Sequence, residues 1–261
     1  MKSLILPPRF SPDSIALRGA AIEANWHVER LQSWRVSDSL KTEDVAIYGE
    51  SLFCAVVADQ LSLFLLEPPF QWLAEIPKEY RLRDVTFCNL AEAKGFREQA
   101  FFKPADDKCF AAKVYDNGAS LPVPEVLPDD TPVLISEPVE WNAEFRFFVL
   151  NGEIQTFSPY SRNGELIQDV NGDWLASEEE TEQAVSLCRG LLENFASSLP
   201  PSVVVDVGEI VGRGWAVVEA NPCFASGIYG CDASKVLQVI ERASVRKLTA
   251  KDERWFIQRG A

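Results

Sequence analysis

The sequence predicts a mixed fold of the α/β (α+β) class, and three observations support this. Short apolar strands alternate with helical segments in the first 85 residues. Longer paired strands dominate from residue 141, and the longest helical pattern stands between two pairs of those strands. The chain has 261 residues, of which 47% are hydrophobic. That is enough to bury a sizeable core without disulfides or a structural metal.

The first part of the chain, residues 1–85, carries a β-α-β-β-α pattern that predicts a small α/β domain. Its expected elements are a strand at 3–6, a helix at 11–24, the strands HVERL and VAIYGE, and a helix at 51–66. Ser11 stands where a helix N-cap is expected. No Gly-x-Gly-x-x-Gly fingerprint follows these strands, so a dinucleotide site is not expected here.

The second part, residues 86–261, is expected to form a second domain with two subdomains, at about 86–140 and about 141–250, followed by a loosely held polar tail. The first subdomain should hold the helix NLAEAK and the strands QAFFKP, CFAAKVY and PVLISEPVEW. In the second, Asn151-Gly152 is a strong hairpin signal between two strands. Helices are expected over 177–199 and from Asp232 to about Arg246.

Composition narrows the function classes. The net charge of −14 argues against binding to nucleic acid or to an anionic membrane surface. Six cysteines without zinc spacing are expected to be reduced, and His27, the only histidine, makes a histidine-based triad untenable. The N-terminus does not read as a signal peptide and no apolar stretch is long enough to span a bilayer, so the expected location is the cytoplasm. The sequence does not indicate an oligomeric state.

Oxygen-bearing side chains gather in the run VVVDVGEIVGRGWAVVEANP. Asp206 lies in its first strand, and Glu219 and Asn221 lie two apart in the second, so these two share a face. The Gly-Arg-Gly turn at 212–214 folds the strands into a hairpin. Two carboxylates and an amide suit Mg²⁺, which fills its shell with water and phosphate oxygens. The alternative is a set of solvent-facing polar residues at strand ends.

Charged residues in the preceding strands fit a nucleotide. Lys103 ends the strand in FFKP and can place a charge on phosphates. Glu137 ends another in ISEPV, whose backbone groups can border a purine. Glu144 can accept hydrogen bonds from ribose hydroxyls, and Arg146 can stabilise charge that develops in acyl or phosphoryl transfer. Solvated strand ends, and an exposed salt bridge for Arg146, are the alternatives.

The order FFKP, ISEPVEWNAEF, VVVDV and VVEANP resembles the ATP-grasp superfamily over roughly residues 86–245. Glu144 lies seven positions after Glu137, and Glu219 lies thirteen positions after Asp206, as in carboxylate–amine ligases of that superfamily. The chain most resembles the clade named for two arginines and one lysine. The resemblance implies an ATP-grasp fold with an N-terminal Rossmann-like pre-grasp domain.

The resemblance also implies roles for single residues. Lys103, with Lys113, would contact nucleotide phosphate. Glu137 and Val139 would bracket adenine, and Glu144 would bind ribose. The magnesium ligands would be Asp206, Glu219 and Asn221. The clade's two arginines and lysine, as the catalytic charges, would be Arg146, Arg162 and Lys103.

Two features depart from the superfamily pattern. The segment ADDKCFAAKVYDNG has no glycine before Gly118, where many members have a glycine-rich loop over the phosphates, so Lys108 or Lys113 would supply charge there. Val204 stands where several ligases carry an arginine before the first metal carboxylate. The positive charge that stabilises the oxyanion would then come from Arg146 or Arg162.

The expected activity is an ATP- and magnesium-dependent ligase that joins a carboxylate, through an acylphosphate, to an amine. The substrates would be amino acids, other small molecules or peptides. Two alternatives stay open at this stage. One is an ATP-dependent phosphotransferase on the same fold, and the other is a nucleotide-binding module without turnover.

Overall fold

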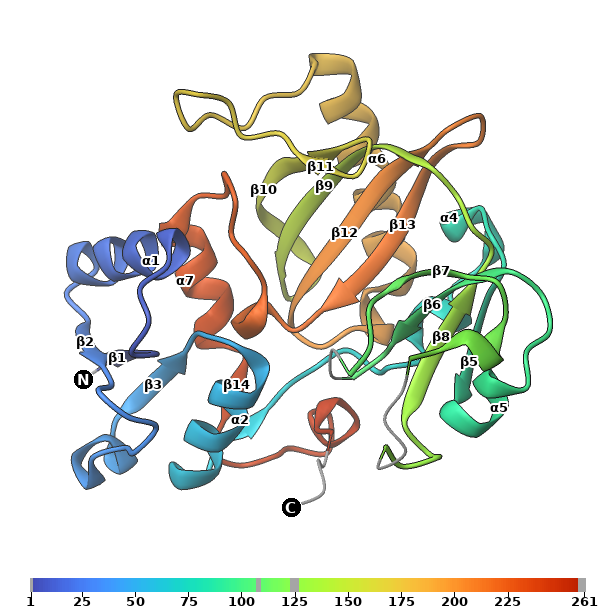
Figure 1. Cartoon of the computed structure of the whole chain (residues 1–261). Helices are drawn as coiled ribbons and strands as arrows, with labels where there is room; N and C mark the ends of the chain where they lie inside the picture. The colour runs from blue at the N-terminus through green and yellow to red at the C-terminus, as the bar shows by residue number, and fades with distance from the viewer. Residues whose placement is uncertain (1, 107–108, 123–126, 258–261) are drawn as a thin grey trace.

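The computed structural model describes residues 2–106, 109–122 and 127–257 (Figure 1). The chain begins with a parallel three-stranded sheet in the order β2-β1-β3. Its strands are β1 (Lys2–Leu6), β2 (His27–Arg30) and β3 (Asp44–Ile47), and its helices are α1 (Pro12–Glu23) and α2 (Ser51–Gln60). The Ser11 hydroxyl accepts a hydrogen bond from the Ser14 amide, which confirms the expected N-cap.

Helices α2 and α7 are shorter than the sequence pattern predicts, because the residues that follow them form a pair of short strands. The helix expected to reach residue 66 ends at Gln60, and the one expected to reach about Arg246 ends at Glu241. Their missing turns pair with each other as β4 (Phe64–Leu65) and β14 (Ser244–Val245). Ser62 takes a left-handed φ of 53°, which breaks the helical path before β4.

A second, four-stranded sheet follows, antiparallel and in the order β5-β8-β6-β7. Its strands are β5 (Val85–Asn89), β6 (Ala100–Pro104), β7 (Lys113–Tyr115) and β8 (Pro132–Ser136). The short helices α3 (Trp72–Glu75) and α4 (Lys78–Arg81) lead into it, and α5 (Leu90–Lys94) packs against it. Its inner face is apolar and contains Phe102.

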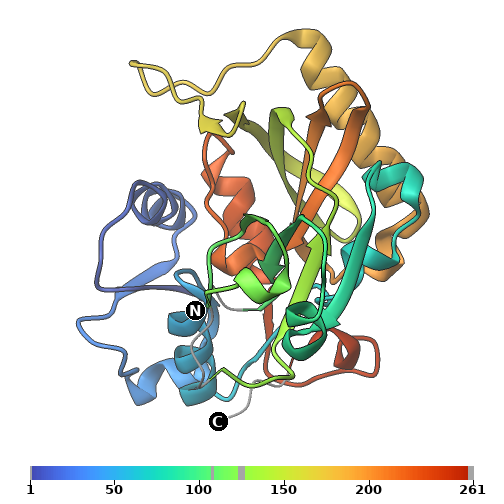
Figure 2. The same cartoon turned by 45° about the vertical axis from the view of Figure 1, so that its right-hand side comes forward.

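The third sheet has five strands in the order β11-β10-β9-β12-β13. The strands are β9 (Trp141–Leu150), β10 (Glu153–Arg162), β11 (Glu165–Leu166), β12 (Ser202–Ile210) and β13 (Gly214–Asn221). Asn151 and Gly152, both at positive φ, join β9 to β10 as expected. Helix α6 (Glu178–Phe195) lies along one face of this sheet (Figure 2).

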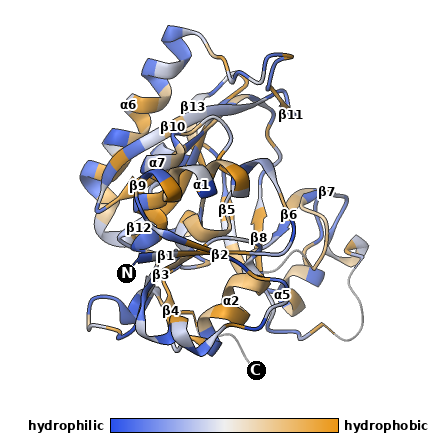
Figure 3. Cartoon of the chain, turned by 90° about the vertical axis from the view of Figure 1, so that its left-hand side faces the viewer, coloured by the Kyte–Doolittle hydropathy of each residue, from blue (hydrophilic) through white to orange (hydrophobic). Residues whose placement is uncertain are grey.

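Hydrophobic and hydrophilic residues alternate along α6 (Figure 3), which is typical of a helix that buries one side. That side presents Ala184, Cys188 and Leu191 to the sheet. The sheet packs against them with alternate residues of its strands, among them Phe147 and Val205. The opposite face of the same sheet is therefore free to carry polar side chains.

The N-terminal core crosses the expected domain boundary. Helix α7 (Ala233–Glu241) packs against α1 and β3, and its apolar residues join those of the first sheet in one cluster. Phe148 of β9 and Val204 of β12 belong to this cluster too. The N-terminal sheet is thus fixed against the five-stranded sheet by a shared hydrophobic core.

The segment after Lys247 is docked, whereas its polarity predicts a loosely held tail. Trp255 is buried, and its carbonyl accepts a hydrogen bond from the Glu67 amide at 2.8 Å. Phe256 packs edge-on against Phe64. Two aromatic residues give this polar segment enough apolar surface to bind the body of the protein. In the described part of the chain, no helix has the length and apolarity to cross a membrane.

Candidate functional site: charged residues between two sheets

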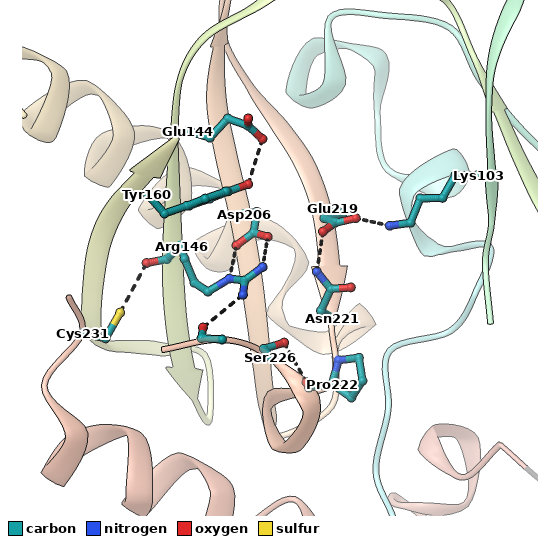
Figure 4. Close-up of polar contacts among 11 residues, drawn as sticks. Lys103, Glu144, Arg146, Tyr160, Asp206, Glu219, Asn221, Pro222, Ser226 and Cys231 are labelled. Carbon is teal, nitrogen blue, oxygen red and sulfur yellow. Dashed lines mark hydrogen bonds and ion pairs between the residues drawn. The ribbon is translucent and has the colours of Figure 1, made fainter. Parts of the chain in front are cut away.

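The face of the five-stranded sheet that points away from α6 carries a cluster of charged residues (Figure 4). Strand alternation places it there, because Phe145, Phe147 and Val205 fill the α6 side and their neighbours turn the other way. The cluster residues from this sheet are Glu144 and Arg146 of β9, Tyr160 of β10, Asp206 of β12, and Glu219 and Asn221 of β13.

Arg146 and Asp206 form a bidentate ion pair at the centre of the cluster. Arg146 Nε donates to Asp206 Oδ1 at 2.9 Å, and Nη2 donates to Oδ2 at 2.7 Å. Arg146 is 7% exposed and Asp206 is fully buried. The guanidinium also donates to the Gly227 carbonyl and lies near the ring of Tyr229. This pair is therefore buried and hydrogen-bonded, and the expected alternative of an exposed salt bridge does not describe Arg146.

Lys103 reaches the cluster from the four-stranded sheet. Its ammonium group donates to Glu219 Oε2, and Asn221 Nδ2 donates to Glu219 Oε1 at 2.7 Å. Lys103 alternates with Phe102, which fills the core of its own sheet, so the lysine points from the opposite face toward β13. Lys103 and Glu219, 116 positions apart in the sequence, thus meet at the boundary between two sheets.

The pKa values of Asp206 and Glu219, two carboxyl groups of the cluster, are shifted in opposite directions. Burial raises the pKa of Asp206 to about 6, against the lowering effect of the Arg146 charge. Burial also tends to raise the pKa of Glu219, but the charge and hydrogen bond of Lys103 outweigh it and bring the pKa to about 2. Glu219 is therefore ionised, as a carboxylate that binds a metal must be. Its negative charge is paired with Lys103.

The low pKa of Glu219 should make the stability of the protein depend on pH. A carboxyl group whose pKa falls from 4.5 to about 2 on folding adds stability above pH 4.5, and that stability is lost as the pH drops. Because a quarter of the side chain is exposed and solvent weakens the interaction, we expect the difference in unfolding free energy between wild type and Glu219→Gln to shrink by about 1 kcal/mol between pH 4.5 and 3. Urea unfolding at both pH values measures it, and a pH-independent difference would contradict the assignment.

Glu144, the expected ribose ligand, lies on the same face. Tyr160 donates its hydroxyl hydrogen to Glu144 Oε2 at 2.8 Å. Gly208, opposite Glu144 on β12, leaves room for the Trp141 and Glu144 side chains, since a Cβ there would stand 2.7 Å from the Trp141 ring and 3.1 Å from Glu144 Cγ. Glu144 is thus set among aromatic side chains with one oxygen engaged.

The expected adenine-bordering segment connects β8 to β9. Glu137 pairs with Arg213 of the β12–β13 turn at 2.5 Å, and hydrogen bonding to Arg213 lowers the pKa of Glu137 to about 2. Val139 is half-buried in the same connection. The Val211 amide donates to the Glu140 carbonyl, so the turn and the connection are joined by backbone as well. The segment therefore lies where the two sheets meet.

Two expected site residues are not brought to the cluster. Lys113 stands opposite Phe102 in the β6–β7 pair, and its ammonium group lies over the Tyr115 ring on the apolar side of that sheet. Arg162 pairs with Glu180 at the start of α6, on the other face of the five-stranded sheet. A bulge in β10 between Pro159 and Ser161 turns Arg162 to that side. Lys108 lies outside the described residues.

Two residues of this region, Arg83 and Tyr229, are assigned no role from the sequence alone. Arg83 donates to two carbonyls of β13 and lies over Trp141, while Tyr229 stacks on Tyr160 with ring centroids 4.7 Å apart. Tyr229 holds a positive φ of 49°, which is uncommon outside glycine and asparagine. The only sequence signal for Tyr229 is its place between glycines in SGIYG, and Arg83 carries none.

The donor set fits a magnesium ion. The described residues include no group of three or more Asp, Glu, His or Cys side chains that could hold a metal. Mg²⁺ needs only one or two protein carboxylates when phosphate and water fill its shell. Asp206 and Glu219 are register partners on adjacent strands, and the Asn221 amide nitrogen donates to Glu219. Binding through Asp206 would compete with Arg146 for the same oxygens.

Comparison with known proteins agrees with this fold. Residues 80–239 match the family model described as ATP-grasp domain, R2K clade family 2. The chain belongs to this family, which confirms the resemblance inferred from the sequence. No curated protein matched.

Solved structures with ATP-grasp folds are similar over nearly the whole chain. A RimK domain ATP-grasp protein from Sphaerobacter thermophilus is 14% identical with a TM-score of 0.54, covering 92% of this chain and 99% of its own. The D-cycloserine synthetase DcsG has 14% identity, a TM-score of 0.55, and coverage of 92% and 98%. D-alanine–D-alanine ligase from Bacillus anthracis complexed with ATP has 12% identity, a TM-score of 0.50, and coverage of 93% and 96%. These likenesses confirm the mixed α/β ATP-grasp fold.

Proposed function

We propose that this chain is an ATP- and magnesium-dependent ligase that joins a carboxylate to an amine through an acylphosphate. The observation that carries the proposal is the meeting of Lys103 from one sheet with Glu219, Asn221 and Asp206 from the other. A cation suited to phosphate and a set of oxygen ligands suited to Mg²⁺ are thus placed side by side. The ligase, synthetase and ATP complex named among similar structures support this choice of reaction.

Each residue has a defined task in this proposal. Lys103 leaves Glu219 and pairs with a phosphate oxygen of ATP, while Glu219, Asn221 and Asp206 are the side chains that would hold the metal. Mg²⁺, when bound, neutralises charge on the phosphates. Glu144 accepts hydrogen bonds from ribose, and Glu137 and Val139 border the adenine. Arg162 and Lys113 have no assigned task at the cluster.

The Arg146 guanidinium lies against Tyr229, 4.9 Å from the centroid of its ring. Three of the five guanidinium N–H donors of Arg146 are engaged by Asp206 and the Gly227 carbonyl. The fixed positive charge stabilises the negative charge that develops on the carbonyl oxygen of the acyl group and on the transferred phosphate. In the reaction, an oxygen of the substrate carboxylate attacks the terminal phosphorus of ATP, the bond to the bridging oxygen breaks, and ADP leaves. The amine then attacks the acyl carbon, its proton passes to solvent, and the C–O bond to phosphate breaks so that phosphate leaves.

A hydroxylamine assay tests the reaction whichever amine is the natural acceptor. The protein is incubated with ATP, Mg²⁺ and a panel of amino acids and other carboxylic acids, with hydroxylamine as the acceptor. We expect phosphate release and a hydroxamate from at least one acid, because acylphosphates react with hydroxylamine. A phosphorylated product that survives the amine would identify a phosphotransferase instead. ATP binding without turnover on any acid would identify a non-catalytic module, and no calorimetric response to ATP with Mg²⁺ would contradict nucleotide binding itself.

A further inference from the structure

One residue of β13 has no partner in β12, and it stands beside Glu219. On one side of the irregularity Val207 pairs with Val217. On the other side Asp206 pairs with Glu219, so two steps along β13 correspond to one step along β12. Val218 is the extra residue, so β13 contains a one-residue β-bulge at this point. Val217 points into the core under α6, and the bulge separates it from the charged cluster.

The bulge decides which face Glu219 occupies. If the Val207–Val217 register continued, Asp206 would stand opposite Val218 and Glu219 opposite Val205. Val205 is fully buried in the core under α6. A shift of one residue exchanges the faces of a strand, so Glu219 would then point into that core. The acidic pair therefore exists because β13 contains one extra residue.

Arg83 binds the two carbonyl groups that flank the extra residue. Its Nη1 donates to the Val217 carbonyl at 2.7 Å, and its Nη2 donates to the Val218 carbonyl at 2.9 Å. Arg83 is 5% exposed, and its guanidinium lies 4.9 Å from the Trp141 ring centroid. Buried carbonyls displaced from a strand ladder need other donors, and a charged donor makes the stronger bond.

We propose that Arg83 is a positioning residue that holds this bulge and thereby keeps Glu219 beside Asp206. Arg83 lies between α4 and β5, where the chain enters the four-stranded sheet that carries Lys103. One guanidinium thus ties the entry of the lysine-bearing sheet to the strand that bears the metal ligands. The proposal rests on the function proposed above, because it assigns Arg83 a role in magnesium-dependent nucleotide binding.

The test compares the affinity for a non-hydrolysable ATP analogue with and without Mg²⁺, by calorimetry on the whole chain. The gain from Mg²⁺ is the factor by which Mg²⁺ increases the affinity for the analogue. In Arg83→Met this gain should fall about 10- to 100-fold, the range known for residues that orient metal ligands. Affinity without Mg²⁺ should change less than about threefold, because Arg83 contacts no nucleotide-binding group. Arg83→Lys should keep part of the gain, since an ammonium group can still bond one carbonyl.

Arg30→Met is the matched control. Arg30 also donates to two backbone carbonyls, those of Pro7 and Arg9, and lies 4.0 Å from the centroid of the Phe10 ring, but it belongs to the N-terminal domain. Its gain from Mg²⁺ should equal that of wild type. In a Glu219→Gln background, Arg83→Met should have no further effect on that gain, since the group it positions is gone.

The outcomes separate this proposal from the proposed function. A wild-type gain from Mg²⁺ that persists in Arg83→Met overturns the role of Arg83 and leaves the function standing. The absence of any gain in wild type overturns both. If Arg83→Met does not fold, Arg83→Lys decides. A reduced gain in a folded protein, measured by circular dichroism, supports the role, and a wild-type gain refutes it.

Discussion

Glu219→Gln is expected to lower magnesium-dependent ATP turnover at least about 100-fold, as does loss of a group that stabilises charge directly at a reacting centre. Glutamine keeps the shape of the side chain and an oxygen for the Asn221 amide. It removes the negative charge that would bind the metal and that now pairs with Lys103. Asp206→Asn should have an effect of similar size. The measurement is phosphate release at saturating ATP over a range of Mg²⁺ concentrations.

Glu209→Gln is the control for these variants. Glu209 lies on the same strand as Asp206, three residues away, and accepts a hydrogen bond from Asn142 on the face opposite the charged cluster. It should keep activity within about twofold of wild type, as expected for a surface substitution away from the site. Full activity in both Glu219→Gln and Asp206→Asn would show that the metal site is assigned to the wrong residues.

Arg146→Met is expected to lower the free energy of unfolding by about 3–5 kcal/mol at pH 8, the usual cost of leaving a buried charge without its partner. Asp206 is fully buried and has both carboxylate oxygens on this guanidinium. Methionine fills much of the same volume and supplies no charge. Combining it with Asp206→Asn should recover part of the loss, because the orphaned carboxylate is then removed. Urea unfolding measures all three variants.

The loss in Arg146→Met should depend on pH. The pKa of Asp206 is already raised to about 6 by burial, and it rises further without Arg146. A carboxyl group whose pKa is raised on folding favours the folded state at low pH, and this stability disappears as the pH rises through that pKa. Arg146→Met should therefore cost less at pH 5 than at pH 8. An equal cost at both values would mean that Asp206 does not carry the effect.

Arg162→Met provides the matched comparison for stability. Arg162 also forms an ion pair, with Glu180 of α6 at 2.8 Å. Its side chain, however, is 36% exposed. An exposed pair contributes about 0–1 kcal/mol. The contrast between the two arginines tests whether burial, and not the ion pair as such, makes Arg146 essential to the fold.

Much of the fold could be predicted from local sequence patterns. Ser11 before Pro12, Asn151-Gly152 and Ser177 with Glu180 are signals whose geometry depends on neighbouring residues alone, and each occurs as expected. The lengths of α2 and α7 could not be predicted this way. Their last turns become β4 and β14, which are about 180 residues apart in the sequence, and no local pattern encodes that pairing.

The candidate site was partly predictable because its residues follow strand alternation. Glu144 and Arg146, two apart, share a face because side chains alternate along β9. Arg162 is expected in the same group, but the bulge in β10 turns it toward α6. The ion pair of Arg146 with Asp206 is not predictable from the sequence either, since it depends on the register between β9 and β12. Bulges and registers arise from tertiary pairing, so sequence spacing alone does not reveal them.

A crystal structure with a non-hydrolysable ATP analogue and Mg²⁺ tests the central claim most directly. The claim is that Lys103 and the oxygen ligands of β12 and β13 surround one triphosphate. We expect the Lys103 ammonium group on a phosphate oxygen and the metal bound by Glu219 together with Asp206 or Asn221. A nucleotide bound away from this cluster, or a triphosphate that touches none of these residues, would contradict it.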